Sequence, residues 1–259
     1  MLKERFSVIY SISGSRGEAS KKAKDICIEQ TVEFPEELIT DSLIRNHIFG
    51  RVESFHKKDK NTYTARISYN VEVSGFELVQ FLNLIFGNIS IKPGIRLEGL
   101  ELPPSLLKIF KGPRFGRSGL RRLLGIKKRP LLCTAVKPLG LDSKRLADLA
   151  YQFALGGIDI IKDDHGITNQ CFSPFEERVR LCAKAVQKAN EKTGKSCIYA
   201  ASINAPADEI MERARLAKGY GAGGLLISPG LVGFDTMRRI ADDDSISLPI
   251  ICHPGLLGT

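Results

Sequence analysis

The chain has 259 residues, 43% of them hydrophobic, which is enough for one large domain or two smaller ones. Its net charge of +9 suits nucleic acid or an anionic small molecule, but no ladder of aromatic side chains accompanies the basic clusters, so nucleic-acid binding is not expected. The N-terminus lacks the apolar core of a signal peptide, and no apolar run reaches membrane-spanning length. The six cysteines show no CxxC pair and no zinc-ligand spacing. We therefore expect a cytoplasmic protein with reduced thiols.

The first part of the chain has the pattern of a small α+β domain of the ferredoxin-like type, which we expect over residues 1–120. Runs of β-branched and aromatic residues predict strands, and amphipathic runs predict helices. The expected elements are a strand over 6–12, a helix over 18–28, strands over 49–56 and 62–73, a helix over 75–86 and a further strand. A stretch rich in glycine, proline and basic residues at 111–117 marks the connector to the next domain.

After the connector, strands and helices alternate strictly, which implies a parallel sheet with right-handed crossovers. The expected strands cover 131–136, 158–163, 197–203, 223–228 and 248–253, and the helices between them cover 142–155, 173–192, 206–219 and 233–242. Polar or ionisable side chains follow several of these strands. A doubly wound sheet concentrates its ligand at one switch point, so this distribution favours a (β/α)₈ barrel of the TIM type over residues 121–259.

The number of strands is too small for a closed barrel. Five strands follow residue 130, whereas a (β/α)₈ barrel has eight. An open five-strand arc would leave edges and apolar faces exposed. We expect the chain to be the N-terminal part of a longer protein, or one half of a split one, with the barrel truncated after its fifth strand. A complete five-strand open sheet is the alternative.

The segment from Gly156 to His165 is an apolar strand that ends in four ionisable residues. Because alternate residues of a strand share a face, Lys162 and Asp164 should point into the barrel and Asp163 away from it. A carboxylate beside substrate oxygens is a plausible site for Mg²⁺. A lysine could contribute to it only as a carbamate, formed from its neutral amine and CO₂. The simpler alternative is an ion pair between Lys162 and Asp164 at the barrel mouth.

Three other strand ends carry candidate side chains. Lys137 could hold a phosphate, move a proton or form a Schiff base, or it could be a solvated loop lysine. His253 could bind a substrate hydroxyl or act as an acid or base, or it could be a satisfied core histidine. Asn204 is more often a turn cap than a site residue. The glycines at 221, 223 and 224 precede a strand and form no GxGxxG, so a dinucleotide site is rejected.

The sequence resembles the large-subunit family of RuBisCO, and more closely its RuBisCO-like (form IV type) branch. Phe110 to Pro113 resembles the connector before the family's barrel, and 134–138 resembles the first barrel strand, whose lysine is the family's proton-transfer base. The strand 156–164 resembles the one that holds the carbamylated lysine and a magnesium-binding aspartate. The resemblance implies that Lys137 is catalytic and that Lys162 and Asp164 bind metal.

The resemblance extends to the rest of the chain. Asn204 and His253 fall on the third and fifth strand ends, which implies catalytic roles, and Thr134 in the first strand is implied to bind substrate. Glu29 and Asn88 resemble residues that the family lends to the active site of a partner subunit, so a homodimer with shared sites is implied.

Three departures separate the chain from RuBisCO itself. The glutamate that completes the family's metal site after the second aspartate is replaced by His165. The second lysine of the first-strand motif is missing from 138–140, and the phosphate-binding arginine after the fifth-strand histidine is replaced by Pro254. These changes point away from carboxylation of ribulose bisphosphate and toward the RuBisCO-like branch, whose members enolise, isomerise or decarboxylate other sugar-derived phosphates.

Our leading hypothesis is a Mg²⁺-dependent RuBisCO-like isomerase or lyase that acts on a phosphorylated ketose or 3-oxo sugar acid through an enediolate. His165 would replace a carboxylate ligand or bind a substrate oxygen, and because imidazole is an unusual ligand for Mg²⁺, Mn²⁺ is an alternative ion. CO₂ would be needed for the carbamate of Lys162. A genuine ribulose-bisphosphate carboxylase and a non-catalytic or regulatory fragment are the rival hypotheses.

Overall fold

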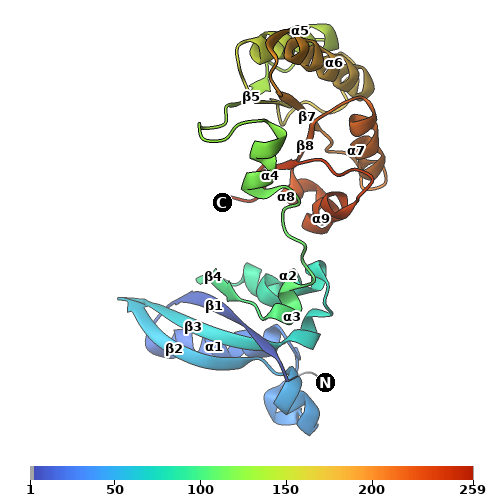
Figure 1. The fold of residues 1–259 in the computed structure, drawn as a ribbon. Helices are drawn as coiled ribbons and strands as arrows, with labels where there is room; N and C mark the ends of the chain where they lie inside the picture. Colours follow the sequence, from blue (N-terminus) through green and yellow to red (C-terminus); the bar gives the residue numbers. More distant parts are fainter. Residues whose placement is uncertain (1–2, 259) are drawn as a thin grey trace. The chain divides into compact units, whose positions relative to one another are not determined.

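The structure is a computed structural model that describes residues 3–258 of the chain (Figure 1). The chain forms two compact units that divide between Lys111 and Gly112, inside the predicted connector and ahead of the domain boundary expected at residue 120. Each unit has its own hydrophobic core and is described by itself. Within the described residues, no helix is both long enough and apolar enough to cross a membrane.

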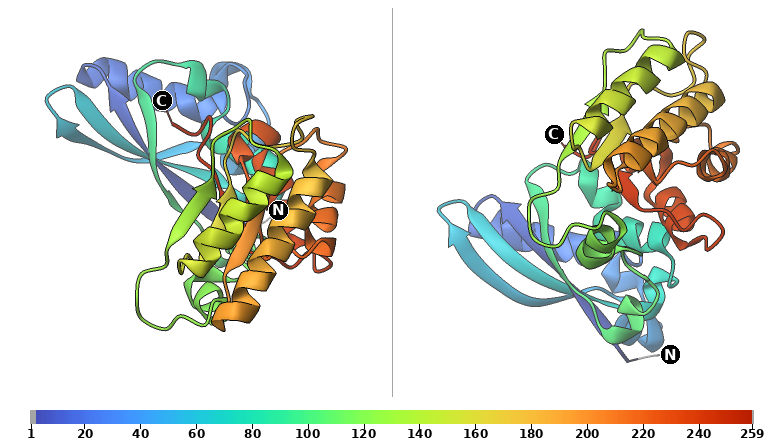
Figure 2. Two further views of the ribbon diagram at one scale, coloured as in Figure 1. Left: turned by 90° about the horizontal axis from the view of Figure 1, so that it is seen from above. Right: turned by 45° about the horizontal axis from the view of Figure 1, so that its top comes forward.

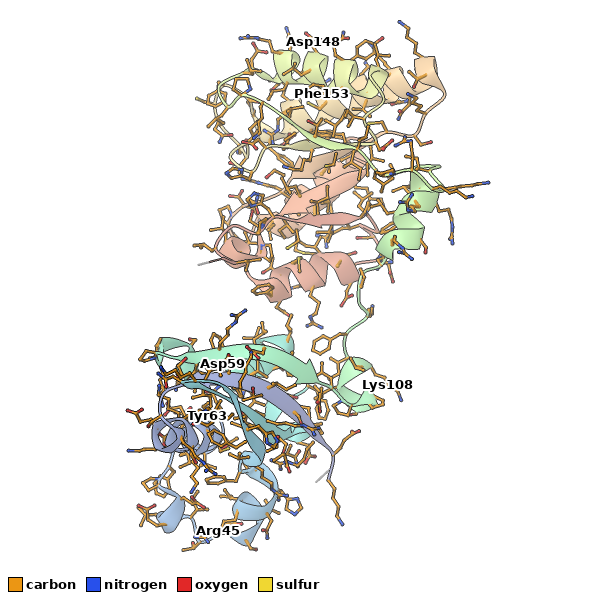
Figure 3. The ribbon with its side chains drawn as sticks, turned by 90° about the vertical axis from the view of Figure 1, so that its left-hand side faces the viewer. Arg45, Asp59, Tyr63, Lys108, Asp148 and Phe153 are labelled. Carbon is orange, nitrogen blue, oxygen red and sulfur yellow. The ribbon has the colours of Figure 1, made fainter. Side chains whose placement is uncertain are left out.

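The first unit is a four-stranded antiparallel sheet with strand order β2-β3-β1-β4. Its elements are β1 (Arg5–Ser13), α1 (Arg16–Glu29), η1 (Glu36–Leu38), η2 (Ile44–Ile48), β2 (Arg51–Asp59), β3 (Thr62–Asn70), η3 (Val71–Ser74), α2 (Leu78–Phe86), η4 (Asn88–Ile91), β4 (Ile95–Glu101) and α3 (Pro104–Leu107). Alternate residues of β1 and β3 are buried against α1 and α2, so the helices cover one face of the sheet. This confirms the expected α+β fold. Tyr63, labelled in Figure 3, stacks on Phe55 with 5.1 Å between ring centroids.

The expected strand over 62–73 ends early, at Asn70. The side chain of Asn70 accepts a hydrogen bond from the backbone N–H of Glu72 at 2.8 Å and starts the 3₁₀ turn η3. A short polar side chain that bonds its own backbone two residues later competes with the sheet hydrogen bonds. The sequence-based expectation followed the apolar run and missed this local turn.

The second unit contains a five-stranded sheet in which all strands are parallel and lie in chain order, β5-β6-β7-β8-β9. Its elements are α4 (Gly116–Leu123), β5 (Cys133–Val136), α5 (Ser143–Leu155), β6 (Ile160–Asp163), α6 (Phe175–Thr193), β7 (Ile198–Ser202), α7 (Ile210–Gly219), β8 (Gly224–Ile227), α8 (Pro229–Val232), α9 (Phe234–Asp242) and β9 (Ile250–Cys252). A doubly wound sheet reverses its order at a switch point, whereas sequential order is that of a barrel. The structure thus confirms the expected partial barrel.

Helices α5, α6 and α7 cover one face of the parallel sheet (Figures 1 and 2). Outward-facing strand residues such as Val136, Ile161 and Leu225 pack into the core beneath these helices. On α5, Phe153 packs against this core while Asp148 faces solvent, and both residues are labelled in Figure 3. The opposite face, which we call the inner face, carries the alternate residues of each strand. In a barrel this face lines the packed interior, and chemistry sits at the carboxyl ends of the strands.

A buried ion pair closes the outer side of β6. Asp163 and Arg178 are both fully buried, and the Arg178 Nε donates to Asp163 Oδ2 at 3.2 Å. Asp163 also accepts hydrogen bonds from the Tyr199 hydroxyl at 2.5 Å and from the backbone N–H of Ser202 at 2.9 Å. Burial, followed by the charge of Asp163, raises the pKa of Tyr199 well above its ordinary value, so the phenol remains a donor.

Replacing Arg178 by Met should destabilise the protein by about 3–5 kcal/mol, because Asp163 would be left as an uncompensated buried charge. The free energy of unfolding is measured by urea denaturation followed by circular dichroism. Arg180→Met, at an exposed position of the same helix, is the control and should change stability by no more than about 0.5 kcal/mol. Equal effects of the two substitutions would contradict this view of the ion pair.

Candidate active site

Lys137, Lys162 and Asp164 lie together at the carboxyl ends of the first two strands of the parallel sheet. Ala135 pairs with Lys162 across β5 and β6, so Lys137, two residues after Ala135, reaches the level of Asp164 on the same inner face. The Lys137 Nζ lies 3.3 Å from Asp164 Oδ1. Lys162 instead donates to the backbone carbonyl of Asp163 at 3.1 Å. The ion pair that the structure forms is therefore Lys137–Asp164, not the Lys162–Asp164 pair considered from sequence.

The Asp164 carboxylate is mostly buried and surrounded by cationic groups. Burial opposes its ionisation and is the largest single effect, but the hydrogen bond and charge of Lys137, with His165 and Lys162 beyond, outweigh it and lower the pKa of Asp164. Asp164 is therefore an anion at neutral pH. The His165 Nδ1 lies 3.5 Å from the same oxygen, Oδ1, that faces Lys137.

A contact between the rings of His165 and His253 connects the ends of β6 and β9, the second and fifth strands of the parallel sheet. Their rings stack with centroids 4.6 Å apart and planes 17° from parallel. The His253 Nδ1 accepts a hydrogen bond from the backbone N–H of Gly255 at 3.1 Å, which assigns its proton to Nε2. Burial, followed by the nearby His165 and Lys162, lowers the pKa of His253. This favours a neutral ring with one N–H to offer a substrate oxygen.

The Asn204 side chain links the ends of β7 and β8. Its Nδ2 donates to Ser202 Oγ at 3.2 Å and to Ser228 Oγ at 3.4 Å, and its Oδ1 accepts from the backbone N–H of Ser228 at 2.8 Å. These bonds occupy both ends of the amide. The geometry therefore favours Asn204 as a positioning residue that holds two strand ends in register, whereas the sequence-based alternative was a local turn cap. Its catalytic role stays a prediction.

Thr134 lies on the other face of β5. It pairs with Ile161, a fully buried core residue, and Val136 on the same face is also fully buried. Ala135 occupies the inner-face position opposite Lys162. Alternate residues of a strand share a face, so Ala135 and Cys133 lie on the same face as Lys137. Thr134 lies on the opposite face and is therefore not brought together with the lysines.

Glu29 and Asn88 meet in the first unit. The Asn88 Nδ2 donates to Glu29 Oε1 at 3.2 Å, and Lys92 forms an ion pair with Glu29 Oε2 at 2.9 Å. The hydrogen bond from Lys92 and then that from Asn88 lower the pKa of Glu29, so its carboxylate is ionised. Sequence reasoning found the first two residues through the family resemblance but missed Lys92, which carries no motif of its own.

The resemblance noted from the sequence implies a divalent cation, and the inner face offers a partial ligand set for it. Asp164 and His165 present one carboxylate and one imidazole, which lie 3.5 Å from each other, while both oxygens of Asp163 are occupied on the outer side. Across residues 3–258, no three His, Cys, Asp or Glu side chains gather as a metal set. The residues therefore fit a metal only with Lys162 as a carbamate, which would add anionic oxygens on the same face.

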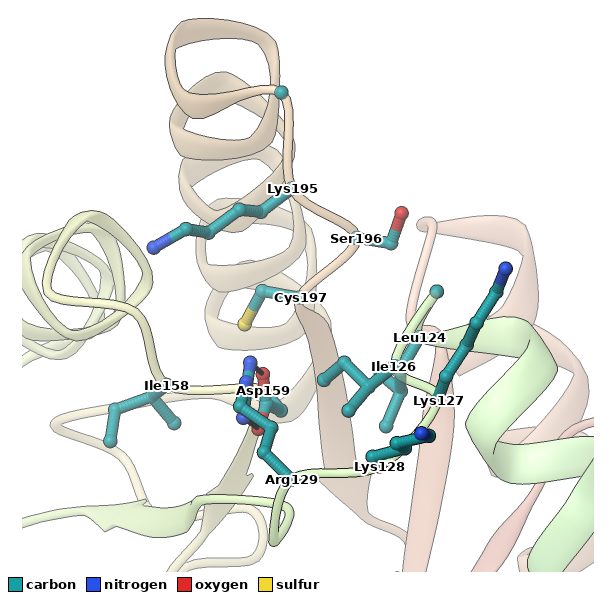
Figure 4. Close-up of a pocket in the computed structure, with 12 residues that line it drawn as sticks. Leu124, Ile126, Lys127, Lys128, Arg129, Ile158, Asp159, Lys195, Ser196 and Cys197 are labelled. Atoms are coloured by element: carbon teal, nitrogen blue, oxygen red, sulfur yellow. Dashed lines mark hydrogen bonds and ion pairs between the residues drawn. The ribbon is translucent and has the colours of Figure 1, made fainter.

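A cavity of about 390 Å³ lies at the amino ends of the strands, opposite the carboxyl ends that carry the candidate site (Figure 4). Its lining includes Arg129, Asp159 and Lys195, which precede β5, β6 and β7. Arg129 and Asp159 form a bidentate ion pair with both N···O distances at 2.7 Å. Conserved chemistry in parallel α/β folds sits at the carboxyl ends of strands, so this cavity at the amino ends is separate from the candidate site.

Comparison with known proteins places these features in a family. Residues 116–253 match the family described as ribulose bisphosphate carboxylase large chain, catalytic domain. The 5-methylthioribulose-1-phosphate isomerase of Rhodospirillum rubrum is 34% identical over 98% of this chain and 68% of its own length.

Solved structures agree with this assignment. A Rubisco-like protein from Rhodopseudomonas palustris superposes with a TM-score of 0.92 at 37% identity, covering 98% of this chain and 71% of that one. A dimeric archaeal Rubisco from Hyperthermus butylicus superposes with a TM-score of 0.86 at 28% identity, covering 98% and 61%. The chain thus spans between three fifths and three quarters of these relatives.

Replacing Asn204 by Ala should destabilise the second unit by about 1–3 kcal/mol, because the buried N–H of Ser228 would lose its acceptor. Amide hydrogen exchange should show faster exchange at Ser228, and chemical denaturation should report the free energy. Asn61→Ala, in the exposed turn between β2 and β3, is the control. Unchanged exchange at Ser228 would count against the bridging role of Asn204.

Proposed function

Because this chain belongs to the RuBisCO large-chain family, within its RuBisCO-like branch, we propose that it enolises a phosphorylated ketose by moving a proton beside the carbonyl. One observation carries the proposal: Lys137, Lys162 and Asp164 meet on the inner face of adjacent strands, where a base, a charge-stabilising group and an anion are within reach of one small molecule. The reaction is of the isomerase or lyase type.

The substrate class follows from the relatives and from the charge of the site. The Rhodospirillum rubrum relative is named for an isomerase of 5-methylthioribulose 1-phosphate, a phosphorylated ketose. Lys137 brings positive charge to the site, and the chain as a whole has a net charge of +9, which suits an anionic phosphorylated substrate. We assign the same class of substrate, with 5-methylthioribulose 1-phosphate as the first compound to assay.

Each side chain of the candidate site would have a separate role in the proposed reaction, set by its position. In its neutral form, after releasing its own proton to solvent, the Lys137 amine would take a proton from the carbon beside the carbonyl to leave an enediolate. It would return that proton at the neighbouring carbon as the hydroxyl proton of the enediol moves to the former carbonyl oxygen. Asp164, held 3.3 Å from the Lys137 Nζ, orients that amine. The His253 Nε2–H would donate a hydrogen bond to a substrate oxygen, since its Nδ1 is held by Gly255. Ser202, Asn204 and Ser228 keep the adjoining strand ends in register.

A divalent cation, Mg²⁺ or alternatively Mn²⁺, would be held by Asp164, His165 and Lys162 as its carbamate. When bound, the cation supplies positive charge that stabilises the enediolate. CO₂ enters as the carbamylating reagent rather than as a substrate. His165, Pro254 and Leu139 stand where RuBisCO itself has a carboxylate, an arginine and a lysine motif, so we expect no carboxylation of ribulose 1,5-bisphosphate.

We further propose a homodimer whose active sites are shared between subunits. Glu29 and Asn88, fixed by each other and by Lys92, form a preorganised carboxylate–amide pair that would complete the site of the second copy. The similarity to a dimeric archaeal Rubisco supports this assembly. Two-fold symmetry would give two equivalent sites per dimer.

Replacing Lys162 by Ala should lower turnover by about 10²-fold or more, because the cation that would stabilise the enediolate would lose its carbamate ligand. Proton exchange of 5-methylthioribulose 1-phosphate with D₂O, followed by NMR, measures the step directly. With ¹³CO₂ and Mg²⁺ present, a carbamate ¹³C resonance should appear for the native protein and for the control Lys144→Ala, an exposed position on α5, but not for Lys162→Ala. Full exchange activity in Lys162→Ala would refute the assignment.

Mixing two inactive variants tests the shared site. Glu29→Gln and Lys162→Ala each damage a different part of the site, so a mixed dimer retains one intact site. Unfolding and refolding them together at equal amounts should restore about a quarter of native activity, as expected for random pairing of a two-fold dimer. Each variant refolded alone is the control, and no recovery in the mixture would contradict a site built from two subunits.

A further inference from the structure

The cavity at the amino ends of β5, β6 and β7 is lined by more positive than negative charge (Figure 4). Four of its lining side chains are basic, and one is a carboxylate, Asp159. The basic ones come from two segments of the chain: Lys127, Lys128 and Arg129 follow α4, and Lys195 follows α6. These segments are far apart in sequence, so the fold itself brings the charges around one volume of about 390 Å³.

The single carboxylate does not neutralise this charge, because its oxygens are already used. Arg129 donates to both Asp159 oxygens at 2.7 Å, and the backbone N–H of Leu132 donates to Asp159 Oδ2 at 2.8 Å. The hydrogen bond from Arg129 is the main effect that holds the pKa of Asp159 below its usual value. The carboxylate is therefore ionised, and its charge is compensated by Arg129 rather than by the lysines.

The three lysines of the cavity are not paired with any carboxylate. Within residues 3–258, Lys127, Lys128 and Lys195 form no ion pair. The Lys195 Nζ lies over Gly157, 3.0 Å from where a Cβ atom would stand, on the side of the cavity that also carries Asp159. Ammonium groups around one hollow repel one another, and an anion bound among them would relieve that repulsion.

The rest of the lining fits a small organic molecule rather than a polymer. Leu124, Ile126 and Ile158 supply an apolar wall, and Ser196 adds a hydroxyl group. Among the described residues, no aromatic side chain lines the cavity, so the bases of a nucleic acid would find no stacking surface. The volume of the cavity is that of a small-molecule site.

We propose that this cavity is a second anion site, which binds a small organic phosphate with at least two negative charges. The unpaired lysines hold the phosphate oxygens as point charges, and the apolar wall packs against the organic part of the ligand. The site lies at the opposite ends of the strands from the candidate active site. Asp159 directly precedes β6, so a ligand here stabilises the strand that carries Lys162 without occupying the reaction site.

Isothermal titration of the whole protein at low ionic strength tests the site with pyrophosphate, a probe that has the required charge and no organic part. The native protein should bind it, and Lys128→Gln/Lys195→Gln should bind it about 10-fold or more weakly, because two attractive charges are removed. Lys184→Gln/Lys188→Gln, at exposed positions on α6, removes the same charge outside the cavity and should change the affinity by less than about two-fold. Lys137→Ala, at the other end of the sheet, should retain the binding.

The backbone N–H signals in an NMR spectrum locate the bound probe. Pyrophosphate should shift the signals of Gly125 and Gly194, which line the cavity. It should leave the signal of Gly255, which donates to His253 at the candidate active site, in place.

Four results would overturn the inference. The native protein could fail to bind pyrophosphate, or binding could be lost in Lys137→Ala and kept in Lys128→Gln/Lys195→Gln, which would place the anion at the candidate active site. Equal weakening in both double variants would reduce the effect to the net charge of the chain. A single-stranded oligonucleotide that binds more tightly than pyrophosphate through the same two lysines would make the ligand a polymer. None of these results bears on the proton transfer proposed for the carboxyl ends of the strands.

Discussion

The organisation of the second unit depends on the need to compensate one buried charge, that of Asp163. An ionised carboxylate without contact to water is tolerated only when its oxygens are hydrogen-bonded and its charge is paired. Arg178 from α6, Tyr199 from β7 and the backbone of Ser202 meet this need on the outer side of the sheet. These contacts join α6, β6 and β7 at the level where the chain leaves the strands. They fix the rotation of β6, and by alternation they turn Lys162 and Asp164 to the inner face.

A second layer of contacts continues this network along the helices. The guanidinium groups of Arg178 and Arg213 both lie 5.6 Å from the ring centroid of Phe175. Arg213 also donates to the backbone carbonyl of Asn204 at 3.0 Å. The ends of β6 and β7 are thus each held by an arginine from a covering helix. The ring of Phe175 lies against both of these arginines. Rigid supports of this kind are what a site needs when its geometry must hold to a fraction of an ångström.

Strand alternation was sufficient to predict the inner-face position of Lys162 and Asp164 and the outer position of Asp163, because a period of two allows no other arrangement. It could not predict what Asp163 binds, since Arg178 lies in a helix whose sequence gives no sign that this one arginine is buried. Thr134 was assigned by family resemblance, and the pairing register places it on the core face instead. The partner of Lys137 also depended on distances across strands, which no single-sequence pattern contains.

The adjacent carboxylates Asp163 and Asp164 illustrate how such a scaffold can diverge. One of them supports the fold from the helix side, and its neighbour faces the candidate site, although a single peptide bond separates them. The His165 side chain is 59% exposed and stacks on His253. Substitution at that position can therefore change reactivity without a cost in stability. Single mutations at position 165 can therefore change the reaction during evolution, while selection for folding acts on Asp163, on the opposite face of the same strand.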